Sequence, residues 1–430
     1  MYIHEKENWT EFRWDSSAIM GLLDMVGRKQ GFLYGRLSTV GFDGRLKAQL
    51  ENLTDDVVYS SEIEGVRLNF DQVRSSIARH LGIENIKYTS PTHYVESVVK
   101  VMLDAMQTYD KPLSKEKLCA WQASFFPHGY SEGVEIKIGK YRSNEEHIVS
   151  GGFGRERIHY IAPSPGRVEE EMQRFLDWFD GDTSESMILR SAIAHFWFVC
   201  IHPFEDGNGR LARLLSDIML ARGDRSELRF YNISSQINKD KKHYYEILER
   251  TQRGSGDLTE WLKWYLQKLN DALDDAEVAI TRVLNKSFFW QRVSEISMSE
   301  RQTRILNLFL DGYEAKIMSK TWAGLAKCSK DTAIRDIQDL VRKGILVEDL
   351  PGAKRPSYSI CYDPEDISQY FTDVKVEEVD GTPYLSAIYN QQRKKERILL
   401  LDAERYHRGD LPVSSLIGKY FAYLMRVSEK

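Results

Sequence analysis

MILRSAIAHFWFVCI, residues 187–201, and HPFEDGNGRLAR, residues 202–213, are adjoining stretches that decide the fold of this chain. The first is apolar, contains no Gly or Pro and is followed at once by Pro203, a pattern typical of a buried helix that ends there. The second turns at Asp206-Gly-Asn-Gly and shows helical spacing again from Arg210 to Arg222. We therefore expect two helices joined by a tight loop, with His202 held at the exit of the first.

The start of the second helix carries groups that suit a nucleotide. Free backbone N–H groups and the helix dipole favour an anion there, and Arg210 and Arg213 lie near one face of the first turn. Asp206 offers a hard oxygen ligand for Mg²⁺, and His202 can accept a proton near neutral pH. Taken singly, such a His is usually a packing or capping residue and Gly-Asn-Gly is usually a turn. Together they predict a phosphate site beside a base.

The loop resembles the signature of the Fic family of nucleotidyl transferases, His-x-Phe-x-(Asp/Glu)-Gly-Asn-Gly-Arg-x-x-Arg, at every defined position. The resemblance implies a mainly α-helical core with a β-hairpin flap. It also implies transfer of AMP from ATP to a Ser, Thr or Tyr hydroxyl of a protein, which can be the chain itself, with release of pyrophosphate. The implied roles are those of a general base for His202, an anchor in the core for Phe204, Mg²⁺ binding for Asp206, phosphate binding for Gly207, Asn208, Gly209 and Arg210, and γ-phosphate binding for Arg213.

A second motif, VYSSEIEG at residues 58–65, matches the family's inhibitory pattern (Ser/Thr)-x-x-x-Glu-(Gly/Asn) through Ser60, Glu64 and Gly65. The resemblance implies an inhibitory helix at about 55–66, in which Glu64 pairs with Arg213 and removes the partner of the γ-phosphate. In some relatives the same Glu orients a water that removes AMP from modified proteins. The alternative interpretation is an exposed helix face that ends at a glycine.

Two short extended runs, His147 to Ser150 and Arg157 to Ile161, flank the glycine-rich residues 151–154 and predict a β-hairpin. The hairpin resembles the Fic flap, whose edge strand can pair with a target backbone. A phosphate-binding loop is the alternative, but no Gly-Lys-(Ser/Thr) follows. Residues 238–248 resemble the segment that closes the adenine side of the pocket, with Tyr244 and Tyr245 as candidate ribose or adenine contacts. Because adjacent tyrosines on a helix point in different directions, one of them fits a core position equally well.

Residues 299–362 resemble a winged helix-turn-helix, with helices at 301–310, from 321 and at 329–340, and two strands around a turn at 351–355. The candidate contacts with DNA or with a docking partner are Lys330, Arg335, Lys354 and Arg355. Three aspartates on the third helix, Asp331, Asp336 and Asp339, oppose DNA binding. We therefore place protein docking or dimer formation slightly ahead of DNA.

The length of 430 residues allows two or three domains. We expect four parts: an N-terminal helical extension at 1–90, a catalytic core at 91–285, a winged helix at 286–362 and a tail of unknown role at 363–430. The extension should contain helices at 16–37 and 46–64, separated near 41–44. In the tail, residues 391–408 are basic and helix-like. The net charge of −5 gives no general attraction to nucleic acid or anionic membranes. Four widely spaced cysteines without Cys-x-x-Cys indicate neither disulfides nor zinc.

The N-terminus lacks a secretion signal, and no apolar run approaches the roughly 18 to 20 residues that span a bilayer. We therefore expect a cytoplasmic enzyme without membrane association, with Mg²⁺ as cofactor and ATP and a hydroxyl-bearing protein as partners; a homodimer is an open option. Two alternatives remain. One is a Fic enzyme that transfers UMP, phosphocholine or phosphate, and the other is a DNA-binding regulator whose Fic core senses nucleotide.

Overall fold

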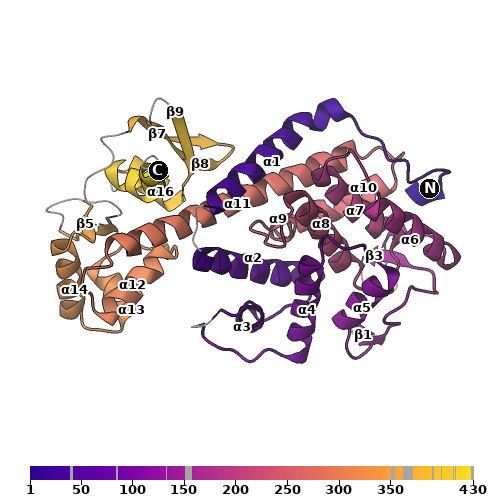
Figure 1. Ribbon diagram of the computed structural model, residues 1–430, viewed down its shortest axis with the longest axis horizontal. Helices are drawn as coiled ribbons and strands as arrows, with labels where there is room; N and C mark the ends of the chain where they lie inside the picture. The colour runs from indigo at the N-terminus through magenta and orange to yellow at the C-terminus, as the bar shows by residue number, and fades with distance from the viewer. Residues whose placement is uncertain are drawn as a thin grey trace. The chain divides into compact units, whose positions relative to one another are not determined.

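The computed structural model describes residues 1–38, 42–83, 86–131, 133–150, 157–349, 354–361, 371–389, 392–398, 400–409, 411 and 413–427. The chain divides into two compact units, Met1–Ser38 with Arg45–Ala276, and Thr39–Gly44 with Glu277–Lys430. Helices dominate, and the strands of the described residues form small antiparallel sheets (Figure 1). The expected mainly α-helical fold is confirmed.

The first unit is built from helices with two short hairpins. Its helices are η1 (Ile3–Glu5), α1 (Ser16–Leu37), α2 (Phe42–Ile63), α3 (Phe70–His80), α4 (His93–Gln107), α5 (Lys115–Phe125), α6 (Pro165–Asp180), α7 (Met187–Ile201), α8 (Asn208–Asp224), α9 (Ile233–Lys239), α10 (Lys241–Gln252) and the first part of α11 (Thr259–Arg292). Its strands are β1 (Tyr130–Ser131), β2 (Val134–Glu135), β3 (His147–Ser150) and β4 (Arg157–Ile161), paired β1 with β2 and β3 with β4. The glycine-rich residues 151–154 lie outside the described residues.

Helices α7 and α8 form the centre of this unit. Every residue of α7 from Leu189 to Ile201 is buried, which explains why its sequence has no polar face. The partner helix α8 is buried from Arg210 to Ala221, and the Trp261 indole donates to the Ala192 carbonyl of α7 at 2.9 Å. Each fully buried large apolar side chain contributes about 1.5–3 kcal/mol. This packing gives the loop between the two helices a rigid base.

The predicted N-terminal helices are present with one shifted boundary. α1 spans Ser16–Leu37, as expected, and Asp15 caps it by accepting from two backbone N–H groups of its first turn. α2 begins at Phe42, whereas a break near 41–44 was expected. The prediction was wrong at that end because a single glycine, Gly44, costs a helix only about 1 kcal/mol. α2 ends at Ile63, and Gly65 follows with φ of +80°.

The second unit holds two cores of its own. Its elements are the remainder of α11, then α12 (Glu300–Leu310), α13 (Ser319–Ala326), α14 (Lys330–Arg342), β5 (Leu346–Glu348), β6 (Tyr358–Ile360), β7 (Thr372–Val379), β8 (Thr382–Tyr389), β9 (Gln392–Arg397), α15 (Leu400–His407) and α16 (Val413–Val427). Ser299 and Ser329 cap α12 and α14, and β5 pairs antiparallel with β6. These three helices and two strands lie where a winged helix was expected, but the turn residues 351–353 are outside the described residues. A winged-helix identity stays a prediction.

The tail differs from expectation. Residues 391–408 have a helix-like pattern, yet residues 392–397 form β9, which pairs with β8 from Tyr384 to Tyr389, and only α15 is helical. The Lys- and Arg-rich run has only a weak local preference for helix. Pairing with strand β8, which carries β-branched and aromatic residues, outweighs that preference. The sheet β7-β8-β9, α15 and α16 enclose a second core that includes Leu385, Ile417 and Phe421. Among the described residues, no helix has the length and apolarity needed to cross a bilayer.

Candidate active site

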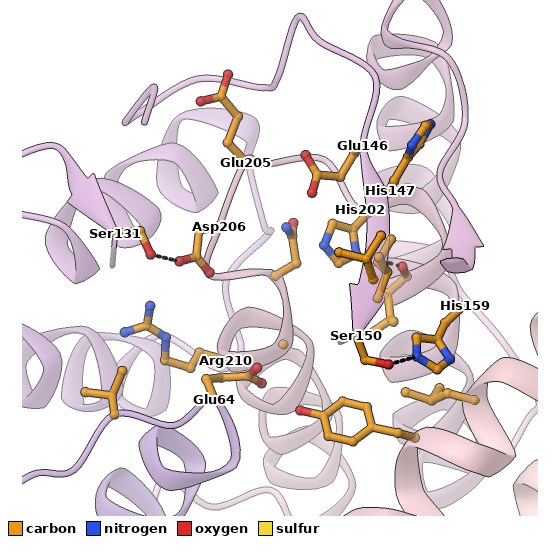
Figure 2. Close-up of a pocket in the computed structure, with 18 of the residues that line it drawn as sticks. Glu64, Ser131, Glu146, His147, Ser150, His159, His202, Glu205, Asp206 and Arg210 are labelled. Atoms are coloured by element: carbon orange, nitrogen blue, oxygen red, sulfur yellow. Dashed lines mark hydrogen bonds between the residues drawn. The ribbon is translucent and has the colours of Figure 1, made fainter. Parts of the chain in front are cut away.

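A cavity of about 1120 Å³ in the first unit is lined by eight of the twelve residues predicted for the catalytic, nucleotide, metal and inhibitory roles. The other four, Ser60, Gly65, Gly207 and Arg213, do not line it. Its wall is formed by the residue after α2, the β1 hairpin, strands β3 and β4, the α7–α8 loop and α10. Figure 2 shows the side chains of Glu64, Asp206 and His202 around this opening. Small-molecule pockets typically have volumes of roughly 300–1,000 Å³. The cavity is therefore large enough for a nucleotide and part of a second reactant.

The α7–α8 loop is held by its own side chains. Phe204 is fully buried. Asn208 Oδ1 accepts from the Phe204 backbone N–H at 3.0 Å, and Asn208 Nδ2 donates to the Phe204 carbonyl at 2.7 Å. Gly207 has φ of +91°, and a Cβ there would lie 3.1 Å from the Phe126 ring. Asn208 thus fixes the loop in this structure, and its predicted contact with phosphate stays a prediction.

His202 ends α7 in a left-handed conformation, with φ of +51°, and lines the cavity. Its Nδ1 lies 3.2 Å from the Val199 carbonyl, which can only accept, so Nδ1 carries the proton. Burial lowers the pKa of His202 to about 4, which the hydrogen bond to Val199 opposes. The imidazole is therefore neutral near pH 7, with its Nε2 lone pair available as a base.

The first turn of α8 and the loop before it carry the predicted metal and phosphate residues. Asp206 lines the cavity, its carboxylate accepts from the Ser131 hydroxyl (Figure 2), and the Gly207 backbone N–H lies 2.5 Å from Asp206 Oδ1. Arg210 also lines the cavity, but its guanidinium donates to the Tyr94 hydroxyl at 2.8 Å and stacks 4.5 Å from the Phe125 ring centre. Aromatic residues thus fix the direction of this cation.

Glu64 reaches the same turn from the end of α2. Its carboxylate lies 2.8 Å from Arg213 Nη2, and the Arg213 side chain is 1% exposed. Arg213 also donates to the Ser60 hydroxyl at 2.9 Å and to the Ser60 carbonyl at 2.8 Å. A Cβ on Gly209 would overlap Glu64 Oε1, so the glycine leaves room for the carboxylate in this position. The carboxylate thus sits where the N-terminus of α8 would receive an anion.

The two candidate tyrosines of α10 have different surroundings, although both line the cavity. Tyr244 is 2% exposed, and its hydroxyl is 2.9 Å from His195 Nε2 in the core. Tyr245 is 43% exposed, and its hydroxyl donates to the Ile63 carbonyl at the end of α2 at 3.2 Å. The structure thus gives Tyr244 the core position that one of the pair was expected to fill.

Glu146 in the cavity wall and Arg142 beside the loop were not grouped with the site by the sequence. Glu146, at the start of the flap, faces the cavity, and burial raises the pKa of this carboxyl to about 7, with Arg142 opposing and Glu205 and Asp206 adding to the rise. Arg142 is buried and donates to the His202 carbonyl at 2.7 Å. These residues lie 60 positions or so from the loop along the chain, so no local spacing could have grouped them with it.

The other candidate contacts belong to the second unit and do not line this cavity. Lys330, Arg335, Lys354 and Arg355 are all exposed. Asp336 accepts from Arg301 at 2.7 and 2.8 Å, and Asp339 accepts from Lys343 at 2.6 Å. Two of the three aspartates expected to oppose DNA are therefore paired with cations of their own unit, and Asp331 remains exposed.

The sequence around the cavity matches a known protein family. Residues 112–220, which include the loop and the flap, match the Fic/DOC family. This part of the chain is a Fic domain. Residues 2–83 match a domain of unknown function, DUF4172.

Curated relatives carry the name Protein adenylyltransferase Fic. One from Nematostella vectensis is 22% identical over 61% of this chain and 57% of its own length, and one from Drosophila willistoni is 39% identical over 25% of this chain and 21% of its own length. The chain thus spans between about a fifth and somewhat more than half of the length of these relatives. A solved Fic family protein from Desulfovibrio desulfuricans superposes with a TM-score of 0.49 at 21% identity, covering 81% of this chain and 97% of that one.

Proposed function

We propose that this protein transfers AMP from ATP to a Ser, Thr or Tyr hydroxyl of a protein, the chain itself included, and releases pyrophosphate. One observation carries the proposal: a neutral imidazole and the first turn of α8, where free backbone N–H groups favour an anion, line the same cavity. The family match and the adenylyltransferase names of the relatives support it. The triphosphate donor is favoured over other donors because Arg213, the predicted partner of the γ-phosphate, is intact.

The donor set around Asp206 fits Mg²⁺. The carboxylate lines the cavity and lies beside the Ser131 hydroxyl, and hard oxygen donors are the ligands this ion prefers. When bound, Mg²⁺ would neutralise phosphate charge and stabilise the leaving pyrophosphate. In this proposal Asp206 holds the metal and Ser131 orients the carboxylate.

The residues of the loop would carry out the proton transfer and stabilise the leaving group. His202 Nε2 accepts the proton of the target hydroxyl while Nδ1–H remains bonded to the Val199 carbonyl. The hydroxyl oxygen attacks the α-phosphorus, and the bond from the α-phosphorus to the pyrophosphate oxygen breaks. Backbone N–H groups at the start of α8 and the Arg213 guanidinium stabilise the charge on the leaving group. A fixed site of this kind avoids reorganising water during the reaction.

The resting protein is proposed to be inhibited by Glu64. Its carboxylate already holds Arg213 and occupies the first turn of α8. A bound γ-phosphate needs the same cation, so the two anions compete for Arg213. We also propose that, in the presence of modified protein, Glu64 can orient a water that removes AMP.

The test uses ATP labelled on the α- or the γ-phosphate and the proteins of a cell lysate, with Glu64→Gly as the active background. We expect label on protein from α-labelled ATP but not from γ-labelled ATP. Adding His202→Ala should lower transfer by about 100-fold or more, because a positioned base typically contributes 10²–10⁴-fold. His243→Ala, on the exposed face of α10, is the control. Protein label from γ-labelled ATP would favour phosphate transfer, and unchanged transfer by His202→Ala would exclude this base.

A second function, DNA binding by the second unit, is favoured by a specific observation. Asp336 pairs with Arg301 and Asp339 pairs with Lys343. These ion pairs neutralise two of the three aspartates that were expected to repel DNA. We therefore propose that Lys330 and Arg335 on α14, with Lys354 and Arg355 before β6, contact DNA phosphates. Docking to a protein, including a second copy of this chain, is the competing outcome.

A further inference from the structure

Three side chains on the flap side of the cavity form a chain of hydrogen bonds that the proposed transfer does not use. The Ser150 hydroxyl, at the end of β3, lies 2.5 Å from His159 Nε2 on β4. Figure 2 marks this hydrogen bond with a dashed line. His159 Nδ1 lies 2.6 Å from Glu249 Oε2 on α10. All three residues line the same cavity as His202 and Asp206.

The surroundings of Glu249 determine which atoms donate and which accept in these two hydrogen bonds. Arg157 lies 3.0 Å from its carboxylate and Arg253 lies 3.4 Å away. Burial raises the pKa of Glu249, but the hydrogen bonds from His159 and Arg157 have the larger combined effect, so the pKa is lowered overall. The ionised carboxylate can only accept, so His159 Nδ1 donates to it and Nε2 accepts from Ser150. A hydroxyl bonded to an imidazole that a carboxylate orients is the arrangement of an activated serine.

Anchoring of the flap alone does not account for this arrangement. Arg253 already donates to the Ile158 and His159 carbonyls of β4, and Arg157 already pairs with Glu249. These contacts fasten β4 to α10 without Ser150. The serine is an exposed residue with its hydroxyl on the cavity side, within the space where a nucleotide is proposed to bind.

We propose that Ser150 is a site at which the protein attaches AMP to itself, with His159 as the base for that step. The inference rests on the proposed adenylyl transfer and names one acceptor for it. Ser150 Oγ attacks the α-phosphorus of ATP, and the bond from the α-phosphorus to the pyrophosphate oxygen breaks. The hydroxyl proton passes to His159 Nε2, and the Glu249 carboxylate stabilises the imidazolium. The products are AMP-Ser150 and pyrophosphate.

The experiment maps AMP by peptide mass spectrometry after Glu64→Gly protein is incubated with MgATP and lysate proteins in one reaction. We expect AMP on Ser150, loss of that modification in Ser150→Ala, and its retention in Ser150→Thr. His159→Asn should reduce AMP on Ser150 roughly 100-fold while transfer to lysate proteins continues, because that transfer uses His202. Ser143→Ala is the matched control, since the Ser143 hydroxyl lies in the same segment but bonds to Lys137 instead of an imidazole.

The outcomes separate this inference from the proposed function. AMP on lysate proteins or on other residues of the chain, with Ser150 unmodified, would overturn the inference and leave adenylyl transfer standing. AMP on no protein at all would overturn both. Unchanged modification of Ser150 in His159→Asn would show that His159 is not the base for this step. Thermal melting followed by circular dichroism shows that each variant is folded, which is expected because Ser150 is exposed and His159 is only partly buried.

Discussion

At the scale of single residues, the contact between Glu64 and Arg213 joins two motifs that lie far apart in the sequence. Glu64→Gly removes the competing anion from the first turn of α8 and should raise self-modification from labelled ATP about tenfold or more, as expected for a coupling of roughly 1–3 kcal/mol. Glu62→Gln is the matched control, because the Glu62 carboxylate on the same helix accepts from Asn238 and not from Arg213. Equal labelling by wild type and Glu64→Gly would remove the inhibition mechanism.

Glu146 gives the site a pH dependence near neutrality. Burial raises its pKa to about 7, so the carboxyl is neutral below pH 7 and charged above it. The added charge lies near Glu205 and Asp206 and repels a triphosphate. In the Glu64→Gly background we therefore expect the KM for MgATP to rise between pH 6 and pH 8, and Glu146→Gln to abolish most of that rise. Parallel KM profiles for the two proteins would show that Glu146 does not act on nucleotide binding.

At the scale of elements, the end of α2 is fastened to the helices around the cavity through its last carbonyl groups. Arg213 donates to Ser60, Lys241 lies 3.5 Å from the Glu62 carbonyl, and Tyr245 donates to Ile63. Such carbonyls have no partner within a helix, so these donors stabilise the docked helix. Docking of α2 is therefore set by several weak contacts besides the one ion pair.

Tyr245→Phe tests this docking. The substitution keeps the ring in the cavity but removes one hydrogen bond of about 0.5–1.5 kcal/mol. Resting transfer should rise by about 2-fold to 10-fold, with no further rise when the substitution is combined with Glu64→Gly. Resting transfer that falls in Tyr245→Phe would instead assign the hydroxyl to nucleotide binding.

The sequence predicts elements best where one pattern dominates. The unbroken apolar run of α7, the serine cap of α14 and the two strands of the flap were each expected from local residues. The contact of Glu64 with Arg213 was expected only through family resemblance. Strand β9 was missed because its partner strand decides its conformation. Glu146, and the pairing of His159 with Glu249, were missed because the fold alone brings these distant residues to one cavity.

At the scale of the whole molecule, the second unit is proposed to bind DNA. If Lys354 and Arg355 contact phosphates, gel shifts should show DNA binding that weakens as salt increases, and Lys354→Glu with Arg355→Glu should reduce both the affinity and the salt slope. Glu substitution at Lys394 and Lys395 of β9 is a matched charge control. No shift by a protein that remains folded would favour docking to a protein instead.

We propose that the protein transfers AMP through the loop after α7 and that Glu64 inhibits this transfer. The most direct measurement is mass spectrometry of Glu64→Gly protein incubated with Mg²⁺, a cell lysate and, in separate reactions, ATP, UTP or CDP-choline. We expect AMP on Ser, Thr or Tyr side chains in the ATP reaction, and much less AMP when the wild-type protein is used. UMP, phosphocholine or phosphate as the attached group, or no attached group with any donor, would contradict the proposal.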